Sequence, residues 1–517
     1  MAARLWKHSA ILVVTPLLLL GGCATRPVNP PIKKYNPEQI SPFDRLDESR
    51  DGRQDMVILA FSGGGMRAAA FSYGTLETLQ RIEVTTTSGK KIRLLDEVDL
   101  ITGVSGGSFT ALAYGMYGEQ LFNFYEHRFL KRNVQGELIA RILNPLNWPA
   151  LASAGWSRSE IAAQLYDEIL FNDATFAELE RTGGPMIAVS STELTTGSRI
   201  VFLQQNFDVM CADLGPFKLS RAAAASSAVP VVLAPITINN YGGTCGYEEP
   251  AWILSLVKTD RKQRSASRIL NRLQDLREIV DATQNPYLHL VDGGVADNLG
   301  LRGVLDFIGT FEALHEAGQP APLDNVRRLI IFVVNAASSP STSWNLSERP
   351  PGGIRTLVQA VGVPIDRFSA ESVELLQDIK ARWALLRQIR HSDAFADNKD
   401  PALAQAVEAP DTDIYVVDVS FDALSDKSER GNLNQLPTSL ALPDDAIDRL
   451  RSAARTIILA SPEFQEALER AGARIIDPPE TVNGCPLEQG EASAHPEAGR
   501  LTDHDSTDRQ CDAQGKQ

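Results

Sequence analysis

The sequence predicts an α/β protein: a three-layer α/β/α sandwich around a mainly parallel sheet, with helical insertions. Short runs rich in apolar and β-branched residues, such as "MVILAF" at 56–61 and "LIIFVVNA" at 329–336, have the length and composition of buried strands. Stretches with helical spacing separate these runs, and several of the runs end directly in glycines. Strands that alternate with helices favour a sheet covered by helices on both faces.

Composition limits the classes of protein to consider. The chain has 517 residues, of which 43% are hydrophobic and 22% charged, which is ordinary for a folded domain; we place that domain at 55–475. The net charge of −15 argues against a nucleic-acid partner, because nucleic-acid binding requires a basic surface. The segment 476–517 is acidic and rich in Gly, Pro and polar residues, which predicts a disordered tail.

The amino terminus has the pattern of an export signal. Arg4 and Lys7 precede an apolar run that is too short to span a bilayer, and the run leads to "LGGC", which ends in Cys23. This box resembles a bacterial lipoprotein signal, which implies removal of residues 1–22, lipidation of Cys23 and an anchor in the bacterial cell envelope. With Ala24 after the cysteine, the resemblance implies the outer membrane. A plain cleaved signal peptide is the alternative, and a membrane-spanning anchor is less favoured.

Three segments fall outside the alternation of strands and helices. Residues 23–54 contain several prolines and no apolar period, which indicates a semi-extended tether. Near 246–285, basic residues accompany apolar residues at helical spacing; this favours a peripheral helix with solvated charges or, alternatively, a lipid-contacting helix or lid. Near 365–391, apolar residues from Phe368 to Leu386 recur at helical spacing and predict a helix with one buried face.

The cysteines beyond Cys23 permit two disulfides in an exported protein. The pairing Cys211–Cys245 with Cys485–Cys511 closes the shortest loops, but other pairings and free buried thiols stay open at this point. No two cysteines lie within four residues of each other, so their spacing predicts no zinc site.

The segment "DLITGVSGGSF" at 99–109 places Ser105 in a Gly-x-Ser-x-Gly motif between a predicted strand and a predicted helix. This is the pattern of a nucleophile elbow, in which small neighbours allow a sharp turn that exposes the hydroxyl. An acyl-transfer serine also needs amides that bind the developing oxyanion, and "SGGGMR" at 62–67 supplies three glycines between a strand and a helix. An ordinary Gly-Ser loop is the alternative interpretation.

Two side chains compete for the role of general base. Asp292 ends a predicted strand in "DGGVADNLG" and could face the serine directly, since a carboxylate serves as a base where geometry and burial suit it. His391 follows Ser105 at a predicted helix end and is the candidate for a triad of serine, acid and histidine. Asp297 and Asn298 are expected to support the turn after Asp292.

The ordered motifs "GGGMR", "GVSGG" and "DGG" resemble the patatin-like phospholipases. The agreement continues through "STELTTGSRIVF" and "AAAASSAVPVVLAPI" and covers residues 56–303. The resemblance implies a patatin-like fold with Ser105 as nucleophile and Asp292 as base. It also implies an oxyanion loop of three successive glycines, Gly63, Gly64 and Gly65.

The same resemblance gives Arg67 a place just after the glycines, where it pairs with a substrate phosphate or supports the helix. Ala68 departs from the family, which often has glycine there, so we expect a small change in loop angle. The implied activity is a phospholipase A type lipid acyl hydrolase that cleaves carboxylic esters of membrane phospholipids through a Ser-Asp dyad and an acyl-enzyme. No metal or organic cofactor is implied. A triad carboxylesterase using His391 and a non-catalytic exported lipid-binding or scaffold protein are the alternatives.

Overall fold

The computed structural model describes residues 25–36 and 53–471, with gaps at 86–90, 154–155, 231, 250–273, 275, 317–324, 339–343, 398–399, 401–402, 404–406 and 408–409, together with 474–475, 481–482 and 485–486. The segment 1–22, Cys23, most of the insertion near 246–285 and most of 476–517 lie outside the described residues. Within the described part of the chain, no helix has both the length and the apolar character needed to cross a membrane.

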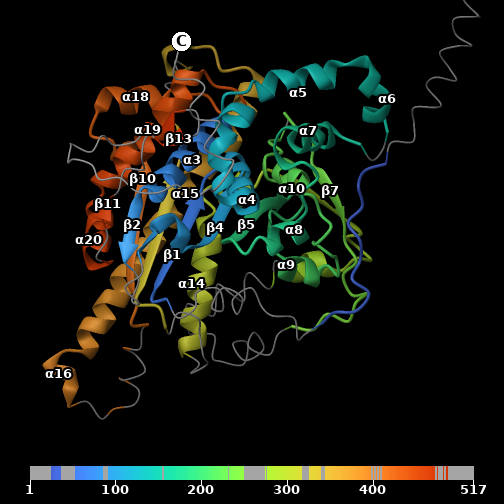
Figure 1. Ribbon diagram of the computed structural model, residues 1–517. Coiled ribbons are helices and arrows are strands. Elements are labelled where there is room, and N and C mark those ends of the chain that lie inside the picture. The colour runs from blue at the N-terminus through green and yellow to red at the C-terminus, as the bar shows by residue number, and fades with distance from the viewer. Residues whose placement is uncertain are drawn as a thin grey trace, which may run out of the picture.

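An eight-stranded sheet forms the centre of the molecule (Figure 1). In spatial order its strands are β10 (Asp413–Ser420), β9 (Arg328–Asn335), β1 (Asp55–Phe61), β4 (Val98–Val104), β5 (Met186–Glu193), β8 (Tyr287–Val291) and β7 (Ile236–Asn239), with β6 (Arg199–Val201) paired to β5 outside this path. From β10 to β5 all neighbours are parallel, whereas β6, β7 and β8 are antiparallel to theirs. The prediction of a mainly parallel sheet is confirmed.

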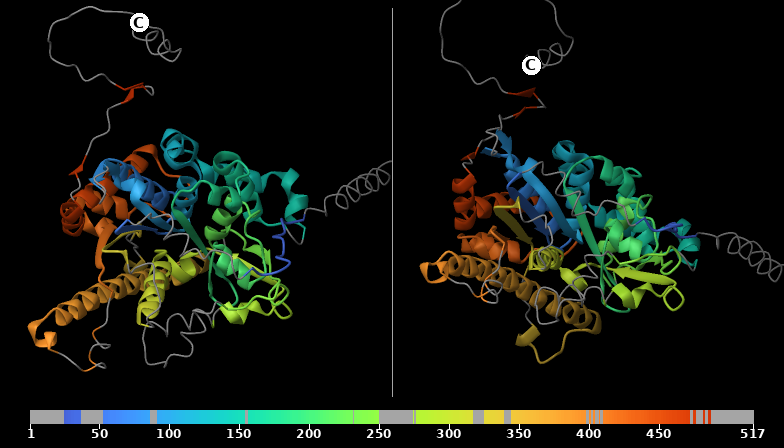
Figure 2. Two further views of the ribbon diagram at one scale, coloured as in Figure 1. Left: turned by 60° about the horizontal axis from the view of Figure 1, so that its bottom comes forward. Right: turned by 90° about the horizontal axis from the view of Figure 1, so that it is seen from below.

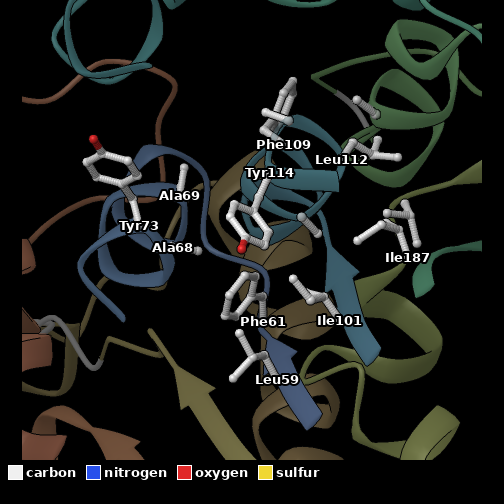
Figure 3. Packing of buried hydrophobic residues seen from close by; sticks show 14 of the residues in the cluster. Leu59, Phe61, Ala68, Ala69, Tyr73, Ile101, Phe109, Leu112, Tyr114 and Ile187 are labelled. Carbon is white, nitrogen blue, oxygen red and sulfur yellow. The ribbon is translucent and has the colours of Figure 1, made fainter. Parts of the chain in front are cut away.

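Strand β1 shows why the sheet carries helices on both faces. Leu59 and Phe61 belong to one buried cluster, whereas Ile58 and Ala60 belong to another, because successive side chains of a strand point to opposite faces. The first cluster includes residues of α3 (Met66–Gln80), α4 (Gly106–Tyr117), α10 (Leu219–Ser226) and α19 (Asp444–Ala460), and the second includes residues of α14 (Leu301–Glu316) and α15 (Gly353–Arg390). Figure 3 shows Leu59 and Phe61 in the first cluster together with Tyr114 of α4. The two covered faces give the three predicted layers.

The predicted carboxyl-terminal insertion is a single long helix, α15, which begins earlier than predicted, at Gly353. It continues through Pro364, a residue type that usually interrupts a helix, and this conceals its true start in the sequence. Leu376 and Trp383 are buried against the sheet as predicted. Phe368 is 42% exposed, so the buried face begins after it.

Residues 25–36, which we call the amino-terminal strap, lie along the domain (Figure 1). The backbone amide of Ile32 donates to the carbonyl oxygen of Cys211 at 2.8 Å. The amide of Tyr35 donates to the carbonyl oxygen of Cys245 at 2.9 Å. The prediction of a free tether is therefore wrong for these residues, because their backbone groups find partners on the folded domain.

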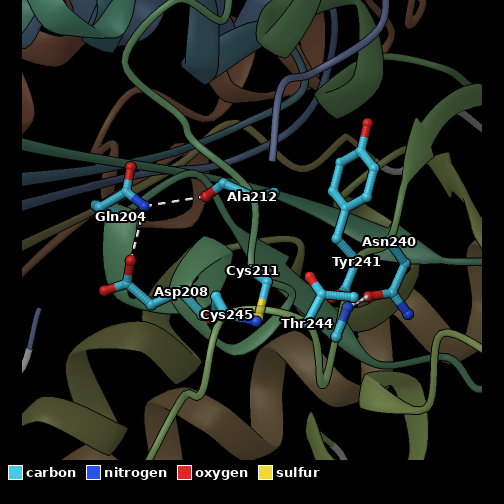
Figure 4. The surroundings of a disulfide bond; sticks show 9 residues. Gln204, Asp208, Cys211, Ala212, Asn240, Tyr241, Thr244 and Cys245 are labelled. Carbon is cyan, nitrogen blue, oxygen red and sulfur yellow. Dashed lines mark hydrogen bonds between the residues drawn. A yellow bond between two sulfur atoms is a disulfide. The ribbon is translucent and has the colours of Figure 1, made fainter. Parts of the chain in front are cut away.

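Cys211 and Cys245 form a disulfide with a Cα–Cα distance of 5.5 Å (Figure 4). This is one of the pairings that the sequence left open. The bond joins residues 34 positions apart, and both of them accept a backbone hydrogen bond from the amino-terminal strap. The second pairing stays a prediction, since Cys511 lies outside the described residues.

Candidate active site

Ser105 lies at the sharp turn between β4 and α4. Its backbone φ is 47°, in the left-handed region that residues with a Cβ rarely adopt. A Cβ on Gly106 would lie 1.9 Å from the carbonyl oxygen of Gly65, and one on Gly107 would lie 2.7 Å from that of Phe61. Glycine is therefore required after Ser105, because α4 begins in contact with the turn that follows β1. Such strained turns are common at functional sites.

The structure brings Ser105 and Asp292 together, although they are 187 positions apart in the chain. The Oγ of Ser105 donates a hydrogen bond of 2.8 Å to Oδ2 of Asp292. Asp292 directly follows β8, and its Oδ1 accepts a second hydrogen bond of 2.8 Å from the amide of Gly294. Both side chains are largely covered, with exposed fractions of 6% for Ser105 and 8% for Asp292.

Burial raises the pKa of Asp292 to about 6, and hydrogen bonds from the Gly294 amide and the Ser105 hydroxyl offset part of that rise. At pH 7 such a carboxyl is mostly ionised, so it can accept a proton. It is also a stronger base than an ordinary aspartate. The geometry and the pKa together suit Asp292 to general-base chemistry on Ser105.

Ser226, the last residue of α10, connects the parts of this site. Its Oγ accepts a 2.9 Å hydrogen bond from the amide of Ser105 and donates a 2.7 Å bond to the carbonyl oxygen of Ser190 in β5. Its own carbonyl oxygen accepts from the amide of Gly293, next to Asp292, at 3.0 Å. The sequence did not single out Ser226 as a site residue. The only signal was its place in the stretch "AAAASSAVP".

The loop of Gly63, Gly64 and Gly65 connects β1 to α3 beside Ser105. The amide of Gly63 donates to the carbonyl oxygen of Asn298 at 2.8 Å, so within the predicted oxyanion loop Gly63 has no free amide to offer. The amides of Gly64 and Gly65 have no hydrogen-bond partner among the described residues. Their φ angles of 139° and 61° are ones that glycine adopts without strain.

Gly106 is a third candidate donor, which sequence reasoning missed. It is the first residue of α4, where backbone amides have no partner within the helix, and nothing in the described ranges accepts its hydrogen bond. Its close approach to Gly65 places it at the glycine loop. Its position directly after the serine could have identified it, because that residue commonly supplies an oxyanion donor at an elbow.

Arg67 is buried, and protein groups occupy its guanidinium. Its Nε donates to the carbonyl oxygen of Ala336 at 2.6 Å and its Nη1 to that of Leu436 at 2.7 Å. Its Nη2 donates to Oγ1 of Thr438 at 3.3 Å. Burial lowers the pKa of Arg67 to about 10, and Asp366 partly opposes this shift. These contacts correspond to the supporting role, and pairing with a substrate phosphate stays a prediction.

His391 is the C-cap of α15, where its amide donates to the carbonyl oxygen of Arg387 at 3.0 Å. Figures 1 and 2 show this end of α15 running into α16 (Asp393–Ala396), at the tip of an arm that extends away from α4. The hydroxyl of Ser105 instead bonds to Asp292. The geometry therefore favours the dyad over the triad.

The fold and this site together define an α/β protein in which a serine at a sharp strand-to-helix turn is hydrogen-bonded to a buried aspartate. Residues 59–305 match the Patatin family model, described as patatin-like phospholipase, and this part of the chain is a patatin-like phospholipase domain. It contains both Ser105 and Asp292.

The chain is also similar to individual proteins. The cGAMP-activated phospholipase of Escherichia coli (strain TW11681) is 27% identical over 197 residues, which are 37% of this chain and 50% of that protein. Human GIVD cytosolic phospholipase A2 aligns at a TM-score of 0.42 and 13% identity, over 87% of this chain and 66% of that one. The type III effector protein ExoU aligns at a TM-score of 0.18 and 15% identity, over 81% of this chain and 75% of that one. The chain thus spans half the length of the curated relative.

Proposed function

We propose that this protein is a lipid acyl hydrolase of the phospholipase A type, which cleaves carboxylic ester bonds of membrane phospholipids through Ser105 and Asp292. The observation that carries the proposal is the 2.8 Å hydrogen bond from Ser105 Oγ to Asp292 Oδ2 at a strained strand-to-helix turn. The patatin-like phospholipase domain over residues 59–305 supports a lipid as the substrate.

The first half of the reaction forms an acyl-enzyme. Asp292 accepts the proton of Ser105 as Oγ attacks the ester carbonyl carbon. The carbonyl oxygen becomes an oxyanion, which the amides of Gly64, Gly65 and Gly106 stabilise. When the intermediate collapses, the ester C–O bond breaks, and the departing lysolipid alkoxide takes the proton from Asp292. The acyl group remains esterified to Ser105.

The second half regenerates the enzyme. A water molecule gives a proton to Asp292 as its oxygen attacks the acyl carbon, and the same amides stabilise the new oxyanion. The bond to Ser105 Oγ then breaks, the fatty acid leaves, and the proton returns to Ser105. Each half-reaction requires the ionised carboxylate at its start, which a pKa of about 6 provides at neutral pH.

Fatty-acid release from mixed phospholipid vesicles tests this function. Wild-type protein should release fatty acid, and Ser105→Ala and Asp292→Asn should each lower the rate roughly 10³-fold or more while retaining the wild-type circular dichroism spectrum. Release that survives Asp292→Asn would move the base to a histidine such as His391. A wild type that hydrolyses no lipid or simple ester, and takes up no fluorophosphonate probe at Ser105, would instead indicate a non-catalytic lipid-binding protein.

We also propose that the protein is exported and anchored through a lipidated Cys23 to the outer membrane of a bacterial cell envelope. The "LGGC" box supports the anchor, and the Cys211–Cys245 disulfide is typical of an oxidising compartment. Cys23→Ala should lose the protein from the membrane fraction. Ala24→Asp is the matched control and should keep the protein in membranes, with a shift toward the inner membrane. Unchanged membrane association of Cys23→Ala would contradict the anchor.

A further inference from the structure

The segment from α5 (Val134–Leu143) through η4 (Pro145–Asn147) to α6 (Trp148–Leu151) carries exposed apolar side chains. Four of them, which we call the α5–α6 apolar surface, have exposed fractions of 49%, 64%, 85% and 56%: Ile139, Leu143, Leu146 and Trp148. Ile139 and Leu143 are one helical turn apart and therefore share a face of α5. Exposed apolar side chains gathered on one short surface segment indicate an interaction site.

These four residues are not the ones that hold α5 to the domain. Val134 and Leu138 are buried in the main core, and Ile142 packs against that core. Helix α5 therefore has one apolar side for folding and a second apolar side that faces outward. The outward side chains stay about half or more exposed and so add little burial to the fold, which indicates a role outside folding.

The amino-terminal strap begins beside α6 in every view of Figures 1 and 2. Hydrogen bonds hold the strap on the domain. Nδ2 of Asn29 donates to the carbonyl oxygen of Asn239 at 2.9 Å, and the amide of Asp213 donates to the carbonyl oxygen of Pro30 at 2.9 Å. Cys23 precedes the strap by two residues, a reach of about 7 Å in an extended chain. Acyl chains on Cys23 would therefore enter a bilayer close to the α5–α6 apolar surface.

The segment 436–442 connects α5 to the candidate active site. On one side, the amide of Gln135 in α5 donates to the carbonyl oxygen of Leu440 at 3.3 Å, and the Leu440 amide donates to Oε1 of Gln135 at 3.1 Å. On the other side, the carbonyl oxygen of Ser439 accepts from the amide of Met66, directly after the glycine loop, at 2.7 Å. The first turn of α5 and the glycine loop are thus neighbours across one short segment, and the α5–α6 apolar surface continues from that helix.

Charges next to the surface are paired within the protein. Nη1 of Arg141 donates to Oε1 of Glu168 at 2.8 Å, and Nε of Arg132 donates to Oε1 of Glu137 at 2.6 Å. The surface therefore offers apolar side chains, including a tryptophan, without an excess of positive charge. Tryptophan and leucine are the residue types that enter the boundary between headgroups and acyl chains. This chemistry fits a bilayer interface irrespective of its anionic lipid content.

We propose that the α5–α6 apolar surface inserts into the phospholipid bilayer to which Cys23 anchors the protein, and that this contact sets the candidate active site against the membrane. The inference rests on the proposed function and anchor. One lipid-anchored point fixes where the protein is held but leaves its orientation free. A second contact next to the first selects one orientation at high effective concentration.

Quenching of tryptophan fluorescence tests the contact without relying on catalysis. Full-length protein is reconstituted in phosphatidylcholine vesicles with and without brominated acyl chains, and Trp148→Phe is compared with the control Trp344→Phe in η7 (Trp344–Leu346). Trp148→Phe should remove most of the bromine-dependent quenching, and Trp344→Phe should leave it unchanged. Equal quenching in wild type and Trp148→Phe would overturn the proposal.

Rates of hydrolysis then test whether this membrane contact sets the candidate active site against the bilayer. The double variant Leu146→Ser/Trp148→Ser should cleave vesicle phospholipid roughly tenfold or more slowly than wild type, and a soluble short-chain ester at the wild-type rate. Leu385→Ser, at a 56% exposed position on α15, is the control and should change neither rate. Equal losses on both substrates, or none on vesicles, would overturn the proposal. If wild type cleaves neither substrate, the proposed function fails, while the quenching experiment still decides whether the surface inserts.

Discussion

The molecule contains two glycine-rich turns that follow neighbouring parallel strands and each begin a helix, yet they present different groups. The turn after β4 places Ser105 in a left-handed conformation and presents a hydroxyl to Asp292. The turn after β1 has glycines at its left-handed positions, Gly64 and Gly65, and presents backbone amides. The side chain at the bend therefore decides whether such a turn presents a hydroxyl or backbone amides.

The two turns also differ in what holds them. The turn after β4 is supported by Ser226, from the helix next to it in the same layer. The turn after β1 is held by Asn298, which accepts from Gly63, and by Ser439, which accepts from Met66. Tertiary partners therefore select which amides of a glycine loop stay free.

Alanine substitution of one glycine in each turn should distinguish the two turns, with the largest expected effect on ester hydrolysis. Gly106→Ala would place its Cβ 1.9 Å from a backbone oxygen, so the turns must separate; we expect ester hydrolysis to fall roughly 10²- to 10³-fold as an oxyanion donor is displaced. Gly63→Ala meets chiefly the end of the Asn298 side chain, which can move, so activity should fall only a few-fold. Steady-state kinetics on a soluble ester measure both. Similar losses in the two variants would contradict the assignment of Gly106 as a donor.

The pH dependence of the rate tests the role of Asp292, which accepts the hydrogen bond from Ser105 in the turn after β4. Because only ionised Asp292 accepts a proton, kcat/KM should rise with pH and level off above about 6. Below that value it should fall about tenfold per pH unit. A rate profile without a midpoint near 6 in wild type would count against Asp292 as the base.

The free energy of unfolding should change with pH in the opposite direction to kcat/KM. The pKa of Asp292 is raised from 3.8 to about 6 in the folded protein, so between these values the native state holds a proton that the unfolded chain has lost. The free energy of unfolding should fall as pH rises through this window, by roughly 3 kcal/mol for this group, and stay level above it. Asp292→Asn should remove that contribution and melt at or above the wild-type temperature at pH 8. Thermal melts of both proteins from pH 4 to 8 provide the measurement.

Substitution of Arg67 tests what holds the turn after β1, and its expected effect on activity is the smallest of these predictions. Arg67→Met leaves the carbonyl oxygens of Ala336 and Leu436 without their donors, so stability should fall by about 2–4 kcal/mol. Arg67→Lys should be intermediate, since it keeps the charge but not the fork of donors. Activity should fall on phospholipid and on neutral ester alike. A higher KM for phospholipid alone, with an unchanged melting temperature, would instead indicate contact with the substrate phosphate.

Much of this architecture could be predicted because it depends on local pattern. The strand at Asp55–Phe61 is apolar on both faces, which predicts a central strand, and the small residues around Ser105 predict the sharp turn. The helix that begins at Gly353 was predicted to begin later, because proline usually interrupts a helix. Nothing in the nearby sequence indicates the packing that tolerates Pro364 inside it. Local pattern also failed for the amino-terminal strap, whose partners are 179 and 210 positions away.

The fold class and the sharp turn at Ser105 were predictable from the sequence, because strand composition and glycine at sharp turns are properties of short stretches. The residues alone left Asp292 and His391 as competing bases, and the resemblance of the ordered motifs to the patatin-like phospholipases favoured Asp292. Packing of distant segments selects which amides of the described glycine loop keep no partner, bonds Arg67 to residues 269 and 369 positions away, and pairs Cys211 with Cys245. It also brought the α5–α6 apolar surface next to the start of the strap. These features depend on contacts between distant segments, and such contacts form only when the layers pack against each other.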